Sequence, residues 1–278
     1  MNLTKTIEKE YEQIEEKSIE ELNCKNDETE QLEILMDLYK YWLEHTRTMK
    51  FDFTFYNEAY NLFFDALHTN IDNLTLKDIT LFSLKLEEYE SRCFFEYTGY
   101  FISAMINYHH FQTKSKDTYI IFTEGFSTKL QGIAKDNNAN VHIIGDVGER
   151  AANNMNGGRI HIEGNTLGYC CERLQNGTVF ISGNVTDNFC SKMTDGNVHL
   201  KGNAEDFACE FMQGGTVIIE KNVANKACQG MYEGNVTIKG NAGREFAAGM
   251  SNGIIYLGEE YQSLGDNIKG GTIKGIEK

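Results

Sequence analysis

The chain has 278 residues, of which 41% are hydrophobic and 24% charged, and its formal net charge at pH 7 is −15. This composition is typical of a globular protein with a sizeable core. The acidic excess argues against nucleic acid or an anionic membrane as a partner, because both are bound by clustered Lys and Arg. The sequence has no apolar run typical of a signal peptide or a membrane-spanning helix, so we expect a cytoplasmic protein.

Charge and aromatic residues divide the chain into two parts. Residues 1 to 120 have 23 acidic and 12 basic residues and hold 21 of the 32 aromatic residues, whereas Gly and Asn are concentrated in the remainder. We therefore predict a two-domain α+β protein. An acidic α-helical domain is expected over residues 1–115, and a second domain over residues 119–278.

The first part is predicted to be helical because its apolar residues recur every three or four positions. One helix is expected around Leu3 to Ile14, a second after Asp27, and a third over residues 55 to 68. The longest predicted helix begins after Thr75 and continues without interruption to Tyr108. We interpret its stripe of large apolar residues as packing in a core or a subunit interface rather than as a cofactor groove.

The second part repeats itself every nineteen residues. The repeat begins at Gly145, Gly164, Gly183, Gly202, Lys221 and Gly240, and positions are counted from these residues. A fixed period of this size predicts a solenoid in which each coil contacts only its neighbours. Partial repeats near Tyr119 and at Gly271 bring the expected total to about seven coils.

The columns of the repeat predict how one coil is built. Position 2 is Asn in five repeats and Asp in one, which predicts a turn that tolerates left-handed φ and side-chain amides that bond from coil to coil. Position 14 is always Gly, which predicts a second turn. Positions 16 and 18 are Val, Ile or Leu and alternate as in a strand, and position 11 is Met or Leu, so these three columns should form the core.

The repeat unit resembles a known family. GNAGREFAAGMSNG, GDVGERAANNMNGG and GNAEDFACEFMQGG resemble the GXGXG repeats of the C-terminal domain of the glutamate synthase large subunit and of the β-helical subunit of formylmethanofuran dehydrogenase. The resemblance covers about residues 140–275 and implies a right-handed parallel β-helix. It also implies a supporting body for catalytic domains or subunits, and it transfers no catalytic residue to this chain.

Two columns offer candidate metal ligands. Position 8, usually glycine in the resembling repeats, carries Cys171, Cys190, Cys209 and Cys228 on consecutive coils, with Ala152 and Ala247 on either side. A straight row of thiols lacks the convergence of a zinc or iron–sulfur site, so we favour packing over a metal or redox role. Position 17 places His142, His161 and His199 on the outward face of the strands. This outward face is partly apolar, and we favour its being covered by the helical part or a partner over its holding a metal or substrate.

No other pattern points to catalysis. The repeat lacks the paired Asp and Glu columns of sugar-processing β-helices, and neither a phosphate-binding glycine loop nor a nucleophile elbow is present. We therefore expect a noncatalytic scaffold or assembly subunit that binds partner proteins, uses no cofactor, and forms either such a complex or a homo-oligomer. The alternative is a metal-binding or oxidoreductase-associated component that uses the histidine face or the cysteine column.

Overall fold

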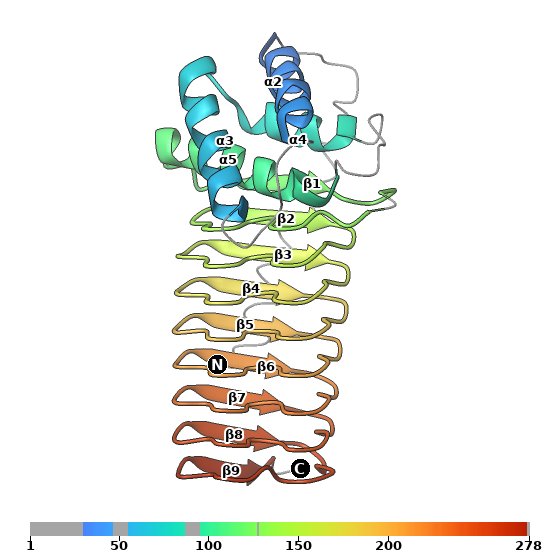
Figure 1. Cartoon of the computed structure of the whole chain (residues 1–278), viewed down its shortest axis with the longest axis vertical. Coiled ribbons are helices and arrows are strands. Elements are labelled where there is room, and N and C mark those ends of the chain that lie inside the picture. Colours follow the sequence, from blue (N-terminus) through green and yellow to red (C-terminus); the bar gives the residue numbers. More distant parts are fainter. Residues whose placement is uncertain (1–29, 47–54, 87–94, 127, 277–278) are drawn as a thin grey trace.

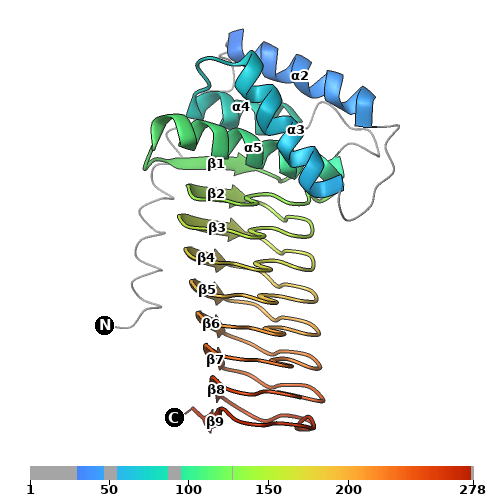
Figure 2. The same ribbon diagram turned by 60° about the vertical axis from the view of Figure 1, so that its left-hand side comes forward.

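The computed structural model describes residues 30–46, 55–86, 95–126 and 128–276, and it consists of a helical cap on one end of a stacked β-solenoid (Figures 1 and 2). The predicted helix over Leu3 to Ile14 lies outside the described residues. Within them, the helices are α2 (Glu30–Thr46), α3 (Phe55–Asn70), α4 (Leu76–Lys85) and α5 (Phe95–Thr113).

The solenoid contains nine described strands in a single parallel sheet whose spatial order equals the order in the chain. This confirms the predicted parallel β-helix, with a strand count close to the seven coils expected. The leading coil that the sequence predicts near Tyr119 contains β1 (Thr118–Phe122), all five residues of which pair with β2 (Asn140–Ile144). The strands are β1 (Thr118–Phe122), β2 (Asn140–Ile144), β3 (Arg159–Glu163), β4 (Thr178–Ile181), β5 (Asn197–Leu200), β6 (Thr216–Ile219), β7 (Asn235–Ile238), β8 (Ile254–Leu257) and β9 (Thr272–Gly275).

The repeat columns build the core as predicted. Positions 11, 16 and 18 point inward, and in coil after coil their side chains are almost completely buried, as Met193, Val198 and Leu200 show in one coil. Each position-14 glycine has a positive φ, for example 99° at Gly196. A Cβ at Gly196 would lie 2.5 Å from Leu174 Cδ2, so both the turn and the close approach require glycine.

The position-2 amides form a ladder along the outside of the solenoid. The Oδ1 atom of Asn165 accepts hydrogen bonds from the backbone N–H of Asn184 at 2.8 Å and from its side chain at 3.3 Å, and Asn203 bonds to Asn184 in the same way. The predicted bonding from coil to coil is therefore confirmed. The predicted left-handed φ is wrong, because none of the position-2 residues has a positive φ.

Left-handed backbone occurs instead at positions 6, 8 and 10. In one coil these are Asn188, Cys190 and Lys192, with φ of 60°, 54° and 58°. The alternation lets the segment bond in both directions, because Asn188 and Lys192 donate their N–H groups to the next coil and Cys190 donates to the previous one. The hydrogen bonds to neighbouring coils satisfy a backbone that is neither helix nor strand.

The cap corrects the prediction of a single long helix from Thr75 to Tyr108. Helix α4 ends at Lys85 with Leu86 as its C-cap, and α5 begins separately at Phe95. In one continuous helix Phe82 and Phe101 would lie about 28 Å apart. Their ring centroids are 5.2 Å apart, because α5 folds back against α4 and buries both rings.

The cap and the solenoid share one continuous hydrophobic core. Helices α4 and α5 lie beside β1, with α2 farther out (Figures 1 and 2). Ser83 Oγ accepts a hydrogen bond from the Phe122 backbone at 3.2 Å, and Ser103 Oγ donates to the carbonyl of Gly132 at 2.9 Å. The helices therefore cover the N-terminal end of the solenoid.

Candidate functional site

The outward histidines form a stacked column at the centres of their strands. The imidazoles of His142 on β2 and His161 on β3 are parallel within 3°, with centroids 4.7 Å apart. Phe180 follows at 5.0 Å from His161, and His199 at 5.2 Å from Phe180. Parallel pairing in register produces this column, because it places the same position of successive repeats one above the other.

The histidine column faces outward from the strands but is buried. His142, His161, Phe180 and His199 are each at most 4% exposed. The equivalent residues of β6, β7 and β8 are half-buried. The burial favours a covered sheet face over an open substrate site on β2 to β5.

Position 19 supplies polar partners that the sequence reasoning missed. Each imidazole Nε2 meets the position-19 residue of the next coil: His142 meets Glu163, His161 meets Ser182 at 3.4 Å, and His199 meets Glu220 at 2.8 Å. The signal was present in the repeat, because a residue two positions later lies on the same face of a strand. Positions 17 and 19 of the repeat therefore share the outward face of the strand.

Burial and charge set the protonation of this column. Burial, helped by His142 and Lys201, lowers the pKa of His161 to about 3, so its imidazole is neutral at pH 7. At Glu220 burial raises the pKa, but hydrogen bonds from Lys239 and His199 outweigh it and hold the pKa below its usual value. Lys239 Nζ lies 2.6 Å from Glu220. Glu220 is therefore an ionised carboxylate between two donors.

One group of residues has the composition of a metal site. The ligand atoms of His142, His161 and Glu163 all lie within 4.8 Å of one another. Ligands of a tetrahedral zinc ion lie about 3.3 Å apart and point to a common centre. Two parallel stacked imidazoles do not converge in this way, so binding a metal would require one ring to turn.

The cysteine column lies inside the solenoid. Cys171, Cys190, Cys209 and Cys228 are all fully buried, as are the alanines that share their position, Ala152 and Ala247. Burial is the largest influence at Cys190 and raises the pKa of this thiol to about 12, which leaves it protonated at neutral pH. The burial and the raised pKa favour packing, and the metal role of this column stays a prediction.

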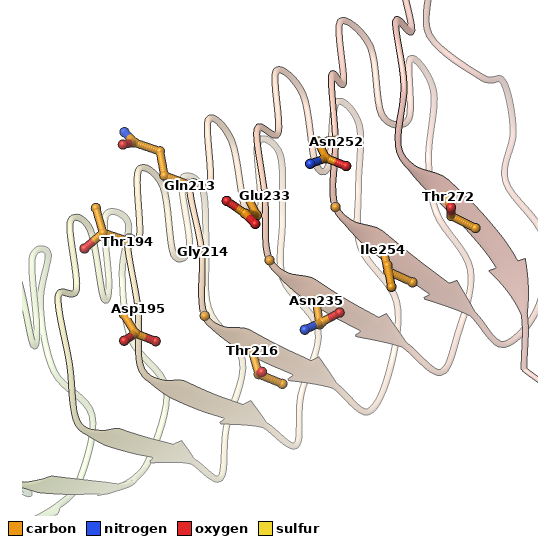
Figure 3. A pocket seen from close by; sticks show the side chains of 13 residues that line it. Thr194, Asp195, Gln213, Gly214, Thr216, Glu233, Asn235, Asn252, Ile254 and Thr272 are labelled. Atoms are coloured by element: carbon orange, nitrogen blue, oxygen red, sulfur yellow. The ribbon is translucent and has the colours of Figure 1, made fainter.

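A polar groove runs along another edge of the solenoid, with a volume of about 750 Å³ (Figure 3). It crosses the turns that precede β5 to β9, and glycines at position 14 form its floor. Sequence reasoning missed it, because its walls come from columns of differing polar residues. The lining side chains are Thr194, Asp195, Gln213, Thr216, Glu233, Asn235, Asn252, Ile254 and Thr272.

Among the described helices, none combines the length and apolar character needed to cross a membrane.

Comparison with known proteins identifies the family of this chain. No curated protein matches the sequence. The model of the family described as GXGXG motif matches residues 98–278, which is well over half of the chain and includes all nine strands. The chain therefore belongs to the GXGXG motif family.

Proposed function

We propose that this protein is a noncatalytic supporting subunit and that a partner protein docks on the C-terminal end of its solenoid. The observation that carries this proposal is the difference between the two ends. Helices cover β1, whereas within the described chain β9 pairs on one side only, with β8. The resemblance to the supporting β-helix of glutamate synthase agrees with this role.

The C-terminal end offers both hydrogen-bonding groups and apolar surface. Tyr261 and Leu264 are 46% and 44% exposed, and Ile268 and Ile273 are only partly buried against the core. The core columns thus reach this end without a covering layer of described residues. An apolar layer with a free strand edge is the surface that strand addition uses.

The hydrogen bonds of β9 show which groups face outward. The N–H groups of Thr272 and Ile276 bond to Gly253 and Leu257 of the preceding coil. Because backbone groups alternate along a strand, the N–H groups of Ile273 and Gly275 point away from β8. Gly275 is the suitable position for a test, because a Cβ added there would meet nothing within 4 Å.

A matched pair of variants tests the docking. Gly275→Pro removes the outward N–H, whereas Gly275→Ala keeps it and adds a similar Cβ. We expect native mass spectra of the protein from its own host to show a defined partner with the wild type and Gly275→Ala, and its loss with Gly275→Pro. A monomer without a partner, a complex of this chain alone, or equal partner retention in both variants would overturn the proposal.

A second candidate function is metal binding by His142, His161 and Glu163, which the proximity of their ligand atoms favours. The expected result is one zinc or iron ion per chain in anaerobically purified protein, lost in Glu163→Gln. The Cys190→Ala/Cys209→Ala double variant distinguishes the cysteine column, because it should keep an ion that the histidines hold. Protein without stoichiometric metal would eliminate this candidate.

A further inference from the structure

The groove over β5 to β9 has the shape of a site for an extended ligand. Its lining residues come from five successive coils, and the spacing of parallel strands makes its length about 19 Å. Figure 3 shows the side chains in lines parallel to the solenoid axis, with Asp195, Glu233 and Asn252 along the turns and Thr216, Asn235, Ile254 and Thr272 at the strand starts. Each coil therefore presents an equivalent place to one unit of a chain-like ligand.

Glycines line the floor of the groove and place no side chains in it. Gly214 separates the turns that carry Asp195 and Glu233, and Gly215, Gly234 and Gly253 occupy position 14 of successive coils. The two carboxylates lie on coils about 10 Å apart, so the structure does not bring them together around a single ion. A ligand lying on this floor would reach backbone as well as side-chain groups.

The chemistry of the walls favours a ligand rich in hydroxyl groups. Hydroxyls, amides and carboxylates can donate to or accept from sugar hydroxyls, and the wall has one aliphatic side chain among the described residues, Ile254. The groove thus offers little to the apolar side chains of a peptide. Tyr232, which is 55% exposed, occupies the same position of the repeat as the lining residues Thr194 and Gln213.

The charge of the groove and of the whole chain restricts the class of ligand further. Within the part of the chain that the structure describes, no Lys, Arg or His lines the groove, and the whole chain is acidic, so an anionic polymer would be repelled. We propose that this groove binds a neutral oligosaccharide lying along the solenoid axis. This inference does not require partner docking at β9, because every lining residue except Thr272 lies on a coil before β9.

The test is a calorimetric titration of the whole chain with cellohexaose, mannohexaose and chitohexaose. We expect at least one hexamer to bind with a Kd below about 1 mM, and its disaccharide to bind more weakly because it spans fewer coils. The double variant Asn235→Ala/Asn252→Ala should weaken binding about tenfold, since both exposed amides line the groove.

The matched control is Asn176→Ala. Asn176 occupies the same position of the repeat as Asn252 but lies outside the groove, so its replacement should leave the Kd unchanged within about twofold. Three outcomes would overturn the proposal: no hexamer binds at millimolar concentration, the control weakens binding as much as the double variant, or spermine binds in the groove while the glycans do not.

Discussion

The helical cap and the solenoid are stabilised in different ways, although one hydrophobic core runs through both. In the cap each contact occurs once, as where Phe101 packs its ring against Tyr39, Phe63 and Phe82 with centroids 5.0 to 5.2 Å apart. In the solenoid each contact recurs every coil, so a column of equivalent residues shares one environment. A substitution in the cap should therefore destabilise the contacts of one residue, whereas a substitution in the solenoid should also affect the equivalent contacts of the neighbouring coils.

The largest expected effect comes from Phe101→Ala. Removing the ring leaves a cavity among three aromatic side chains and should lower the free energy of unfolding of the cap by about 4 kcal/mol. Hydrogen exchange should accelerate in α2 to α5 and stay slow in β4 to β8. Phe111→Ala is the control, because Phe111 is 59% exposed. Equal acceleration in the distant coils would show that cap and solenoid unfold as one unit.

A smaller loss is expected from Gly196→Ala in the middle of the solenoid. The new Cβ meets Leu174 Cδ2 at 2.5 Å and the carbonyl of Gly177 at 2.9 Å, and φ is 99°. Strain and overpacking should cost about 3 kcal/mol, measured by urea unfolding. Gly275→Ala, which has open space for its Cβ, should change stability little. Similar losses in the two variants would contradict the explanation from close approach.

The histidine column should make stability depend on pH. The pKa of His161 is about 3 in the folded protein and about 6.5 in the unfolded chain, so only the unfolded chain gains this proton as pH falls below 6.5. The free energy of unfolding should therefore fall by about 2 kcal/mol between pH 7 and pH 5. His161→Phe, which resembles Phe180 on the next coil, should remove this part of the slope. An unchanged slope would refute the assignment to His161.

The smallest expected effect is a gain in stability at the turns. Lys192 has a φ of 58°, which costs a side chain about 1 kcal/mol relative to glycine. Lys192→Gly should raise the free energy of unfolding by about that amount, whereas Lys192→Ala should leave it nearly unchanged. At ordinary positions alanine is the more stabilising residue, so thermal unfolding of both variants tests the left-handed backbone directly. A more stable alanine variant would contradict it.

The left-handed residues of each coil alternate with residues of ordinary φ. Positions 6, 8 and 10 are the alternate left-handed residues of each coil, and in this chain they are mostly not glycine, as Asn188, Cys190 and Lys192 illustrate. The coil-to-coil hydrogen bonds of their N–H groups hold this backbone in place. The cysteines at position 8 therefore occupy a conformation that glycine would adopt more readily.

The sequence predicted features that depend on local pattern. Period-two alternation identified the inward residues of each strand, and the position-14 glycines identified a turn, because these signals act over a few residues. It did not predict the contact between His199 and Glu220, which joins neighbouring coils. It also missed the break between α4 and α5, since the apolar stripe continues across residues 87–94 at helical spacing.

The nineteen-residue period by itself determined that this chain stacks into a parallel solenoid, because each coil repeats the same turns and the same inward side chains. Tertiary structure alone decided the rest. Whether Phe82 meets Phe101, whether His161 is buried, and whether Asp195, Asn235 and Thr272 line one groove depend on how segments far apart in the chain are placed. Such contacts are set by packing across elements, which periodicity within one element does not specify.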